Sequence, residues 1–108
     1  MSTSRYKSKV ELLLRIVPII TGESVFAIHG GTAINLFVKN FLRYSVDIDL
    51  TYLPLKGRQE SINEINDALR RISDKIKKAL KGTQVSHRED ICKLLCTHKD
   101  NQVKIEVN

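Results

Sequence analysis

Residues 30–33 read Gly-Gly-Thr-Ala, and residues 43–50 read Arg-Tyr-Ser-Val-Asp-Ile-Asp-Leu. Residues two apart in a β-strand point to the same face, so Asp47 and Asp49 are predicted to lie together while the apolar residues around them face the other way. Two carboxylates held close together repel each other unless a divalent cation or a shared proton offsets their charge. The pair therefore indicates a magnesium site, with two aspartates on a solvated strand face as the alternative.

The glycine pair lies where a buried strand is predicted to enter a helix. Residues 25–28 form a short apolar run that ends in His29 and the glycines. Thr32 is a suitable cap for a helix over residues 33–41, a segment that is apolar nearly all round. Backbone N–H groups and the positive end of such a helix would meet at the glycines, where no Cβ blocks a phosphate. A plain turn between a strand and a helix is the alternative.

The rest of the chain predicts two more helices and further strands. Apolar residues at helical spacing predict a helix over residues 4–21 and a long amphipathic helix over residues 62–80 that ends before Gly82. Alternating or apolar runs predict strands over residues 44–52, 84–87, 91–98 and 103–107. The last two strands are predicted to be joined at Asp100-Asn101. These elements indicate one domain over residues 1–108, in the α+β class, with helices packed on a small mixed sheet.

Glu106 is a candidate third carboxylate. In the strand over residues 103–107 the apolar residues pack one way, which leaves Lys104 and Glu106 on the opposite face. If this strand neighbours the strand of Asp47, Glu106 completes a site of three carboxylates suited to two-metal phosphoryl or nucleotidyl transfer. Taken alone, Glu106 fits a solvated strand residue better than a catalytic one.

The composition is that of an ordinary globular protein, with 42% hydrophobic and 28% charged residues. A net charge of +6 suggests a polyanionic partner, and much of the positive charge lies between Arg70 and Lys81. A solvated helix face would also explain that run. The longest apolar stretch, residues 10–20, is too short and too charged for a membrane span, so a cytoplasmic location is expected. Cys92 and Cys96 are expected to be two reduced thiols on one strand.

The order of these motifs resembles the DNA polymerase beta-type nucleotidyltransferase superfamily. The string GGTAINLF followed by RYSVDIDL is similar to the abortive-infection toxins of the AbiEii/AbiGii type in particular. In that family a Gly-Gly-Thr-Ala turn precedes an Arg-x-Ser-x-Asp-Ile-Asp-Leu strand. The likeness is close over residues 26–50 and extends loosely to Val107.

The resemblance implies a site for a nucleoside triphosphate and one or two magnesium ions. It implies that Asp47 and Asp49 bind magnesium and that Glu106 takes the third acidic position. It also implies a set of residues that hold the triphosphate or support the aspartates, namely Gly30, Gly31, Thr32, Arg43 and Ser45.

The expected reaction moves a nucleoside monophosphate from the triphosphate to an acceptor hydroxyl on RNA, including tRNA, or on a protein. A toxin of this type also implies a cognate antitoxin partner. Family members usually continue beyond the third catalytic strand, so the chain is expected to be the N-terminal portion of the usual length. Two alternatives are a truncated module that binds nucleotide, RNA or a partner without turnover, and a minimal nucleotidyltransferase antitoxin, although the latter usually has Gly-Ser at residues 30–31.

Overall fold

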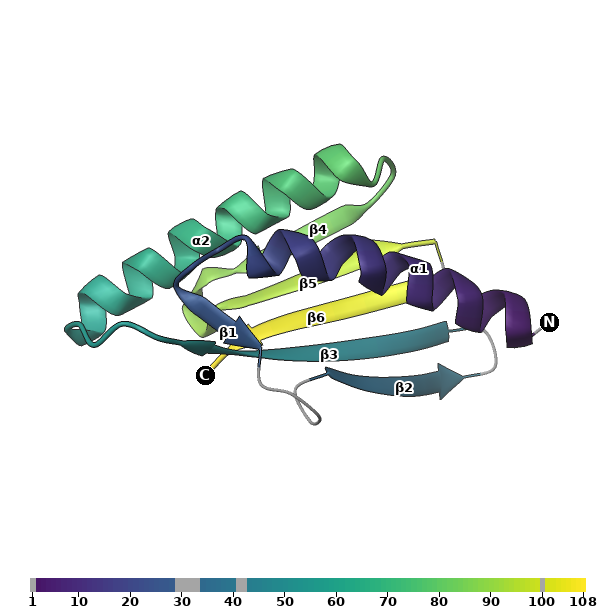
Figure 1. Ribbon diagram of the computed structural model, residues 1–108, viewed down its shortest axis with the longest axis horizontal. Helices are drawn as coiled ribbons and strands as arrows, with labels where there is room; N and C mark the ends of the chain where they lie inside the picture. Colours follow the sequence, from purple (N-terminus) through teal and green to yellow (C-terminus); the bar gives the residue numbers. More distant parts are fainter. Residues whose placement is uncertain (1, 29–33, 41–42, 100) are drawn as a thin grey trace.

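The computed structural model describes the backbone of residues 2–28, 34–40, 43–99 and 101–108, and the side chains of residues 7–8, 10–28, 45–99 and 101–108. Its helices are α1 (Ser2–Thr21) and α2 (Arg58–Ala79), with a 3₁₀ turn, η1 (Glu89–Ile91). Its strands, labelled in Figure 1, are β1 (Phe26–Ile28), β2 (Ile34–Asn40), β3 (Arg43–Tyr52), β4 (Gln84–Arg88), β5 (Lys93–His98) and β6 (Asn101–Val107).

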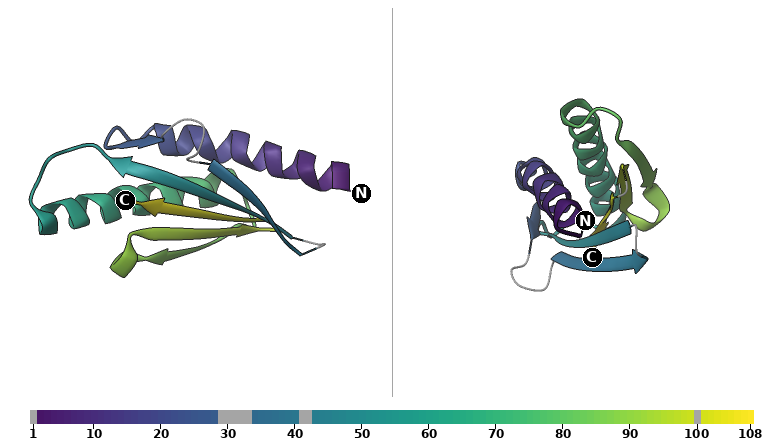
Figure 2. Two further views of the ribbon diagram at one scale, coloured as in Figure 1. Left: turned by 90° about the horizontal axis from the view of Figure 1, so that it is seen from below. Right: turned by 90° about the vertical axis from the view of Figure 1, so that its right-hand side faces the viewer.

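The strands form a six-stranded mixed sheet in the order β1-β3-β6-β5-β4, and β2 also pairs with β3. β3 and β6 run parallel, whereas the other strand pairs are antiparallel. Both helices lie on the same face of this sheet, as the end-on view in Figure 2 shows. α1 contacts β1, and α2 contacts β4 and β5. The predicted α+β class, with helices packed on a small mixed sheet, is confirmed.

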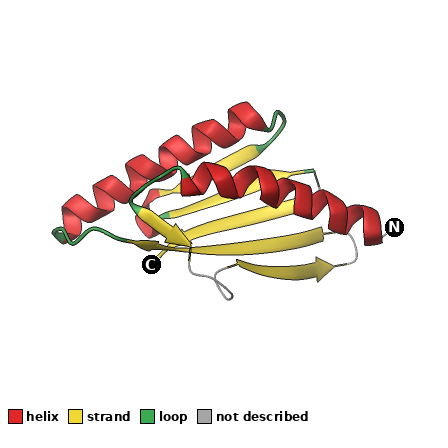
Figure 3. Ribbon diagram, in the orientation of Figure 1, coloured by secondary structure: helices red, strands yellow, loops and turns green. Residues whose placement is uncertain are grey.

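The core lies between the helices and one face of the sheet. Figure 3 draws these helices in red and the strands in yellow. In the middle of β3 the alternating side chains of Val46, Ile48 and Leu50 are fully buried, because they point toward the helices. The helices contribute apolar residues three or four positions apart, the spacing that keeps them on one side of a helix. Fully buried members of this core include Ile16, Ile20, Leu69, Ile72, Ile76, Leu94, Val103 and Ile105. The residues between these strand positions therefore face away from the helices.

Polar contacts fix the helices relative to each other. Glu23, which follows α1 and is only 7% exposed, accepts hydrogen bonds from Arg71 Nε and Nη2 on α2, the shortest at 2.8 Å. Arg71 lowers the pKa of the Glu23 carboxyl, mainly through these hydrogen bonds. On α1, Arg15 Nη2 donates to the Ala79 carbonyl at the end of α2 at 2.8 Å. A charged pair with paired hydrogen bonds has a defined geometry, so the two helices form one layer.

The helix predicted over residues 33–41 is wrong, because Ile34–Asn40 form strand β2. This segment pairs antiparallel with β3, with Ile34 opposite Ile48 and Val38 opposite Tyr44. An apolar run of this length has no clear period, so the sequence alone does not distinguish a buried strand from a buried helix. Backbone hydrogen bonding to β3 decides the outcome. The expected positive helix end is therefore not present at this point.

The connection between the last two strands lies one residue earlier than predicted. β5 and β6 pair with His98 opposite Asn101, so residues 99 and 100 connect them and Asn101 already belongs to β6. Lys99 has a φ of 54°, the left-handed conformation that two-residue hairpin turns require. The shift changes which residues face each other across the hairpin.

Candidate active site

The three candidate carboxylates lie on two adjacent parallel strands. β3 and β6 are in register so that Asp49 is opposite Glu106 and Asp47 is opposite Lys104. Directly opposed residues of paired strands share a face, and this face is the one that the helices leave open. The strand of Glu106 thus neighbours the strand of Asp47, which is the condition stated above for Glu106 to join the aspartates.

The glycine segment is joined to the sheet beside Asp49. On the edge of β3 away from β6, Ile28 of β1 is opposite Leu50 and Ile34 of β2 is opposite Ile48. In an unbroken strand one residue would stand opposite Asp49, whereas here the five residues 29–33 connect the two positions. Gly30, Gly31 and Thr32 lie outside the described residues. Their attachment points nevertheless flank Asp49, whose other neighbour is Glu106.

Asp47 has an unsatisfied carboxylate oxygen. Its Oδ1 is buried, and among the described residues it has no hydrogen-bond partner. A buried polar atom without a partner is costly, and in native proteins such atoms frequently mark a functional site or an unseen ion. Carboxylate oxygens are the ligands that magnesium prefers. The residues present therefore fit a magnesium ion at Asp47 and Asp49.

Glu106 has a partner that the sequence reasoning missed. Lys93 Nζ lies 3.0 Å from Glu106 Oε1, and Lys93 stands directly opposite Glu106 across the β5–β6 pair. Within the part of the chain that the structure describes, no three His, Cys, Asp or Glu side chains are grouped so that one ion could bind them all. Glu106 is thus on the predicted face but ion-paired to Lys93. A turn placed correctly at residues 99–100 would have revealed this pair.

Of the two residues expected to support the aspartates, Arg43 and Ser45, the structure describes the side chain of Ser45. Arg43 begins β3, but its side chain lies outside the described set. Ser45 is 2% exposed and lies on β3 two residues before Asp47, hence on the same face. A buried hydroxyl beside the aspartates suits a role in positioning them better than a role in contacting a large ligand.

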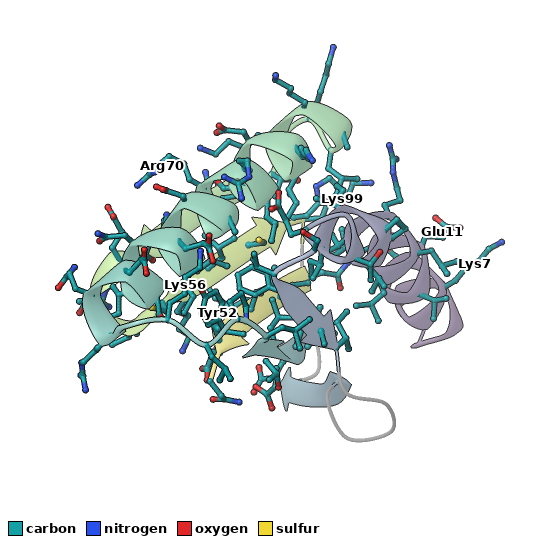
Figure 4. The ribbon with its side chains drawn as sticks, turned by 60° about the vertical axis from the view of Figure 1, so that its left-hand side comes forward. Lys7, Glu11, Tyr52, Lys56, Arg70 and Lys99 are labelled. Carbon is teal, nitrogen blue, oxygen red and sulfur yellow. The ribbon has the colours of Figure 1, made fainter. Side chains whose placement is uncertain are left out.

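A polar cluster anchors the far end of β3 to α2. Tyr52 at the end of β3 donates a short hydrogen bond to Glu64, which also accepts one from Lys56 Nζ at 2.9 Å. Burial raises the pKa of Tyr52, and the bond to Glu64 raises it further, whereas the same bond lowers the pKa of Glu64. Figure 4 shows Tyr52 and Lys56 side by side, below α2. The cluster fixes the strand that carries Asp47 and Asp49.

The cysteines do not contribute to this site. Both are free thiols. Burial raises the pKa of Cys96 to about 12, which keeps its thiol protonated and unreactive. Cys92 lies just before β5 with a φ of 51°, so the prediction that both cysteines belong to one strand is wrong.

The positive residues of α2 are partly neutralised. Arg70 pairs with Asp67 and Glu89, and Arg71 pairs with Glu23. Among the described residues, the exposed lysines 75, 77, 78 and 81 form no ion pair within 4.0 Å. Neither helix of the described chain has an apolar stretch of the length needed to cross a bilayer.

Comparison with known proteins gives a family. No curated protein and no solved structure matches the chain. The sequence model described as "Nucleotidyl transferase AbiEii toxin, Type IV TA system" matches residues 11–107, a span that includes β3, β6 and the segment between β1 and β2. Since this match covers most of its length, the chain belongs to the AbiEii family of nucleotidyltransferase toxins of type IV toxin-antitoxin systems.

Proposed function

We propose that this chain transfers a nucleoside monophosphate from a triphosphate to an acceptor hydroxyl and that Asp47 and Asp49 hold the required magnesium. The observation that carries the proposal is the buried Oδ1 of Asp47, which has no hydrogen-bond partner among the described residues. It lies in a strand register that adds Asp49 and Glu106 to the same face. An unsatisfied carboxylate among other carboxylates is a preformed ligand set for a divalent ion.

The proposed reaction is an in-line displacement at the α-phosphorus. The acceptor oxygen forms a bond to that phosphorus, the bond to the β-phosphate oxygen breaks, and pyrophosphate leaves. Magnesium at this site would neutralise the charge that develops on the phosphate oxygens. Asp47 and Asp49 would hold this ion, and their strand is fixed by its neighbours on both edges.

Glu106 and Lys93 provide two further charges of the site. We assign Glu106 to the third acidic position, where it accepts the proton of the acceptor hydroxyl or holds a second ion. Lys93 Nζ lies 3.0 Å from Glu106 Oε1 and neutralises its charge. Since a lysine ammonium also binds phosphate as a point charge, Lys93 can transfer its interaction from Glu106 to an incoming triphosphate. This exchange would release Glu106 at the moment when substrate is present.

The triphosphate is proposed to lie over the segment between β1 and β2. Gly30 and Gly31 permit close approach of phosphate to the backbone, and Thr32 adds a hydroxyl donor. The support for this placement is that both ends of the segment adjoin Asp49. Arg43 and Ser45 are proposed to hold the aspartates or a phosphate oxygen from the start of the same strand.

The proposed acceptor is RNA, including the end of tRNA, because the exposed lysines near the end of α2 favour a polyanion. A protein hydroxyl is the alternative acceptor. The family assignment also implies a cognate antitoxin. Such a reaction would take place in the cytoplasm, where triphosphates and RNA are available.

The decisive experiment measures label transfer. The chain is incubated with magnesium, each α-³²P-labelled nucleoside triphosphate and total RNA, and is compared with Asp47→Asn and Glu106→Gln. We expect label on RNA with at least one triphosphate. Asp47→Asn should lower the rate about 100-fold or more, the usual cost of removing one group from a preorganised electrostatic site.

A matched control separates loss of chemistry from loss of fold. Asp74→Asn makes the same chemical change at an exposed position of α2 and should transfer label at the wild-type rate. Label on a protein instead of RNA would identify the alternative acceptor or the antitoxin-type enzyme. Binding of triphosphate with no transfer to either would contradict the proposal and leave a binding module.

A further inference from the structure

A small polar pocket lies on the other side of the sheet, between the helices and the β5–β6 hairpin. Its volume is about 160 Å³, enough for a phosphate group with a few waters at roughly 30 Å³ per water. Its polar lining consists of Ser8, Glu11 and Arg15 from α1 with His98 and Lys99 from the hairpin. Figure 4 shows Lys99 between the ribbons of the two helices and Glu11 on α1.

The lining carries a positive charge that contacts among the described residues do not fully neutralise. Among the described residues of the lining, Arg15 and Lys99 contribute two positive charges against one negative charge from Glu11. Arg15 donates one hydrogen bond to the Ala79 carbonyl, but its guanidinium has five N–H donors in total. Lys99 makes no ion pair within 4.0 Å among the described residues.

His98 adds a titratable group to the same pocket. Its Nδ1 lies 2.9 Å from Thr83 Oγ1, so the ring orientation is fixed and Nε2 is the nitrogen that can meet a ligand. Burial, followed by the charges of Lys99 and Arg15, lowers the pKa of His98. An anion in the pocket would offset those charges and favour the protonated ring.

The surroundings extend the positive charge beyond the pocket. Lys77 and Lys78 occupy the last turn of α2, and Lys81 follows it. Leu80, which lies between them in sequence, lines the pocket. Part of this charge complements the negative end of the helix. The lysines are exposed, however, so they could also contact neighbouring phosphates of a longer ligand.

We propose that this pocket binds a phosphoryl group through Arg15, Lys99 and His98. It is separate from the candidate active site, because it is on the helix side of the sheet and the candidate carboxylates are on the other side. It is also distant along the strand: His98 stands opposite Asn101, which precedes Glu106 by five residues, about 16 Å along β6 at 3.3 Å per residue. A dianionic phosphate would balance Arg15 and Lys99, and His98 would take up a proton to become a donor. The group can belong to free phosphate or to a nucleic-acid backbone.

The first test follows the His98 imidazole by NMR during a titration with inorganic phosphate. We expect saturable binding that raises the pKa of His98 by about 1, the change typical of a nearby opposite charge. Lys99→Asn should weaken binding at least about 10-fold, and asparagine tolerates the left-handed conformation of this residue. Glu11→Gln should strengthen binding instead, because it removes the one negative charge among the described residues of the lining.

The opposite signs of these two variants make the test specific. A substitution that merely disturbed the fold would not tighten binding, whereas loss of repulsion at Glu11 does. Arg58→Gln removes an exposed positive charge at the other end of α2 and should leave phosphate binding unchanged. No change in His98 at 20 mM phosphate, or equal effects of Lys99→Asn and Arg58→Gln, would overturn the proposal.

A second arm identifies the source of the phosphoryl group. Titration with a single-stranded RNA octamer should also raise the pKa of His98 if the pocket accepts a backbone phosphate. Binding should then weaken when Lys77 and Lys78 are changed to glutamine, and the variant should show a smaller salt dependence. Phosphate binding without an RNA effect on His98 assigns the pocket to a free phosphate group. RNA binding that leaves His98 and the Lys99→Asn variant unaffected contradicts a backbone site.

Discussion

Asp47 differs from the other acidic residues of the described chain in having a buried oxygen without a partner. Glu23 is buried as a whole residue but is satisfied by Arg71, and Glu106 is paired with Lys93. Asp47 therefore has the most to gain from a bound cation. The contrast among these three carboxylates separates a structural ion pair from a ligand site.

Magnesium should stabilise the protein through Asp47. A ligand that binds only the folded state at ten times its dissociation constant adds about 1.4 kcal/mol to the free energy of unfolding. For a domain of this size that raises Tm by roughly 5–10 °C. Differential scanning fluorimetry with and without magnesium checks this shift. It should disappear in Asp47→Asn and persist in Asp74→Asn; equal shifts in all three proteins would show that magnesium binds elsewhere.

Elements whose apolar residues recur at a regular spacing could be predicted from the sequence. An element whose state depends on hydrogen bonds to a neighbouring strand could not. α1 and α2 follow from apolar residues at helical spacing, and β3 follows from its alternation. β2 was mispredicted because Ile34–Asn40 is short and apolar, and its state depends on hydrogen bonds to β3. Local propensity does not contain that information.

The candidate site was predictable to the same extent. The shared face of Asp47 and Asp49 follows from strand geometry, but the position of Glu106 depended on the neighbour of β3. Lys93 was missed because the hairpin was placed at residues 100–101, which would set Leu95 opposite Glu106. In the structure the hairpin turn pairs His98 with Asn101, and this register places Lys93 opposite Glu106. A turn position that differs by one residue thus changes the charge of the site.

The end of α2 depends on Gly82. This residue has a φ of 86°, and an added Cβ would meet no atom within 4 Å. Gly82→Ala should therefore destabilise through backbone conformation alone, by about 1–2 kcal/mol. Gly57→Ala is the matched control, because the φ of Gly57 is −58° and its surroundings are equally open. Urea denaturation measures both; an equal loss in the two variants would contradict this account.

At the scale of the whole molecule, two interactions that join separate elements depend on pH. The Glu23–Arg71 pair connects the end of α1 to α2, and His87 Nε2 lies 3.0 Å from Asn66 Oδ1 between β4 and α2. Burial lowers the pKa of His87, as it does for His98. Contacts within the helix layer and between that layer and the sheet are therefore both expected to weaken in acid.

Stability should fall in two steps as the pH decreases. Both histidines have folded-state pKa values below their ordinary 6.5, so the unfolded chain binds more protons and stability declines once the pH drops below 6.5. The pKa of Glu23 is below its ordinary 4.5, so its contribution is present above pH 4.5 and is lost as the pH falls through the folded-state value. Urea denaturation at several pH values measures both steps.

Glu23→Gln tests the second step. It should lower the free energy of unfolding at pH 7 by about 1–3 kcal/mol, because it removes charged hydrogen bonds to a buried group. The lower acid step should then be smaller. Asp67→Asn removes an exposed ion pair with Arg70 and should change stability by less than about 0.5 kcal/mol. A Glu23→Gln variant with an unchanged acid profile would show that the pair does not control this step.

The interior position of β3 has a consequence for hydrogen exchange. β3 is hydrogen-bonded along both edges, to β6 on one side and to β1 and β2 on the other, whereas β4 forms an outer edge. Amides in strands bordered on both sides exchange only through the larger opening reactions of a domain. Those of β3 and β6 should therefore be the most protected, and the β4 edge should open first. The geometry of Asp47, Asp49 and Glu106 is then preserved while the periphery opens and closes.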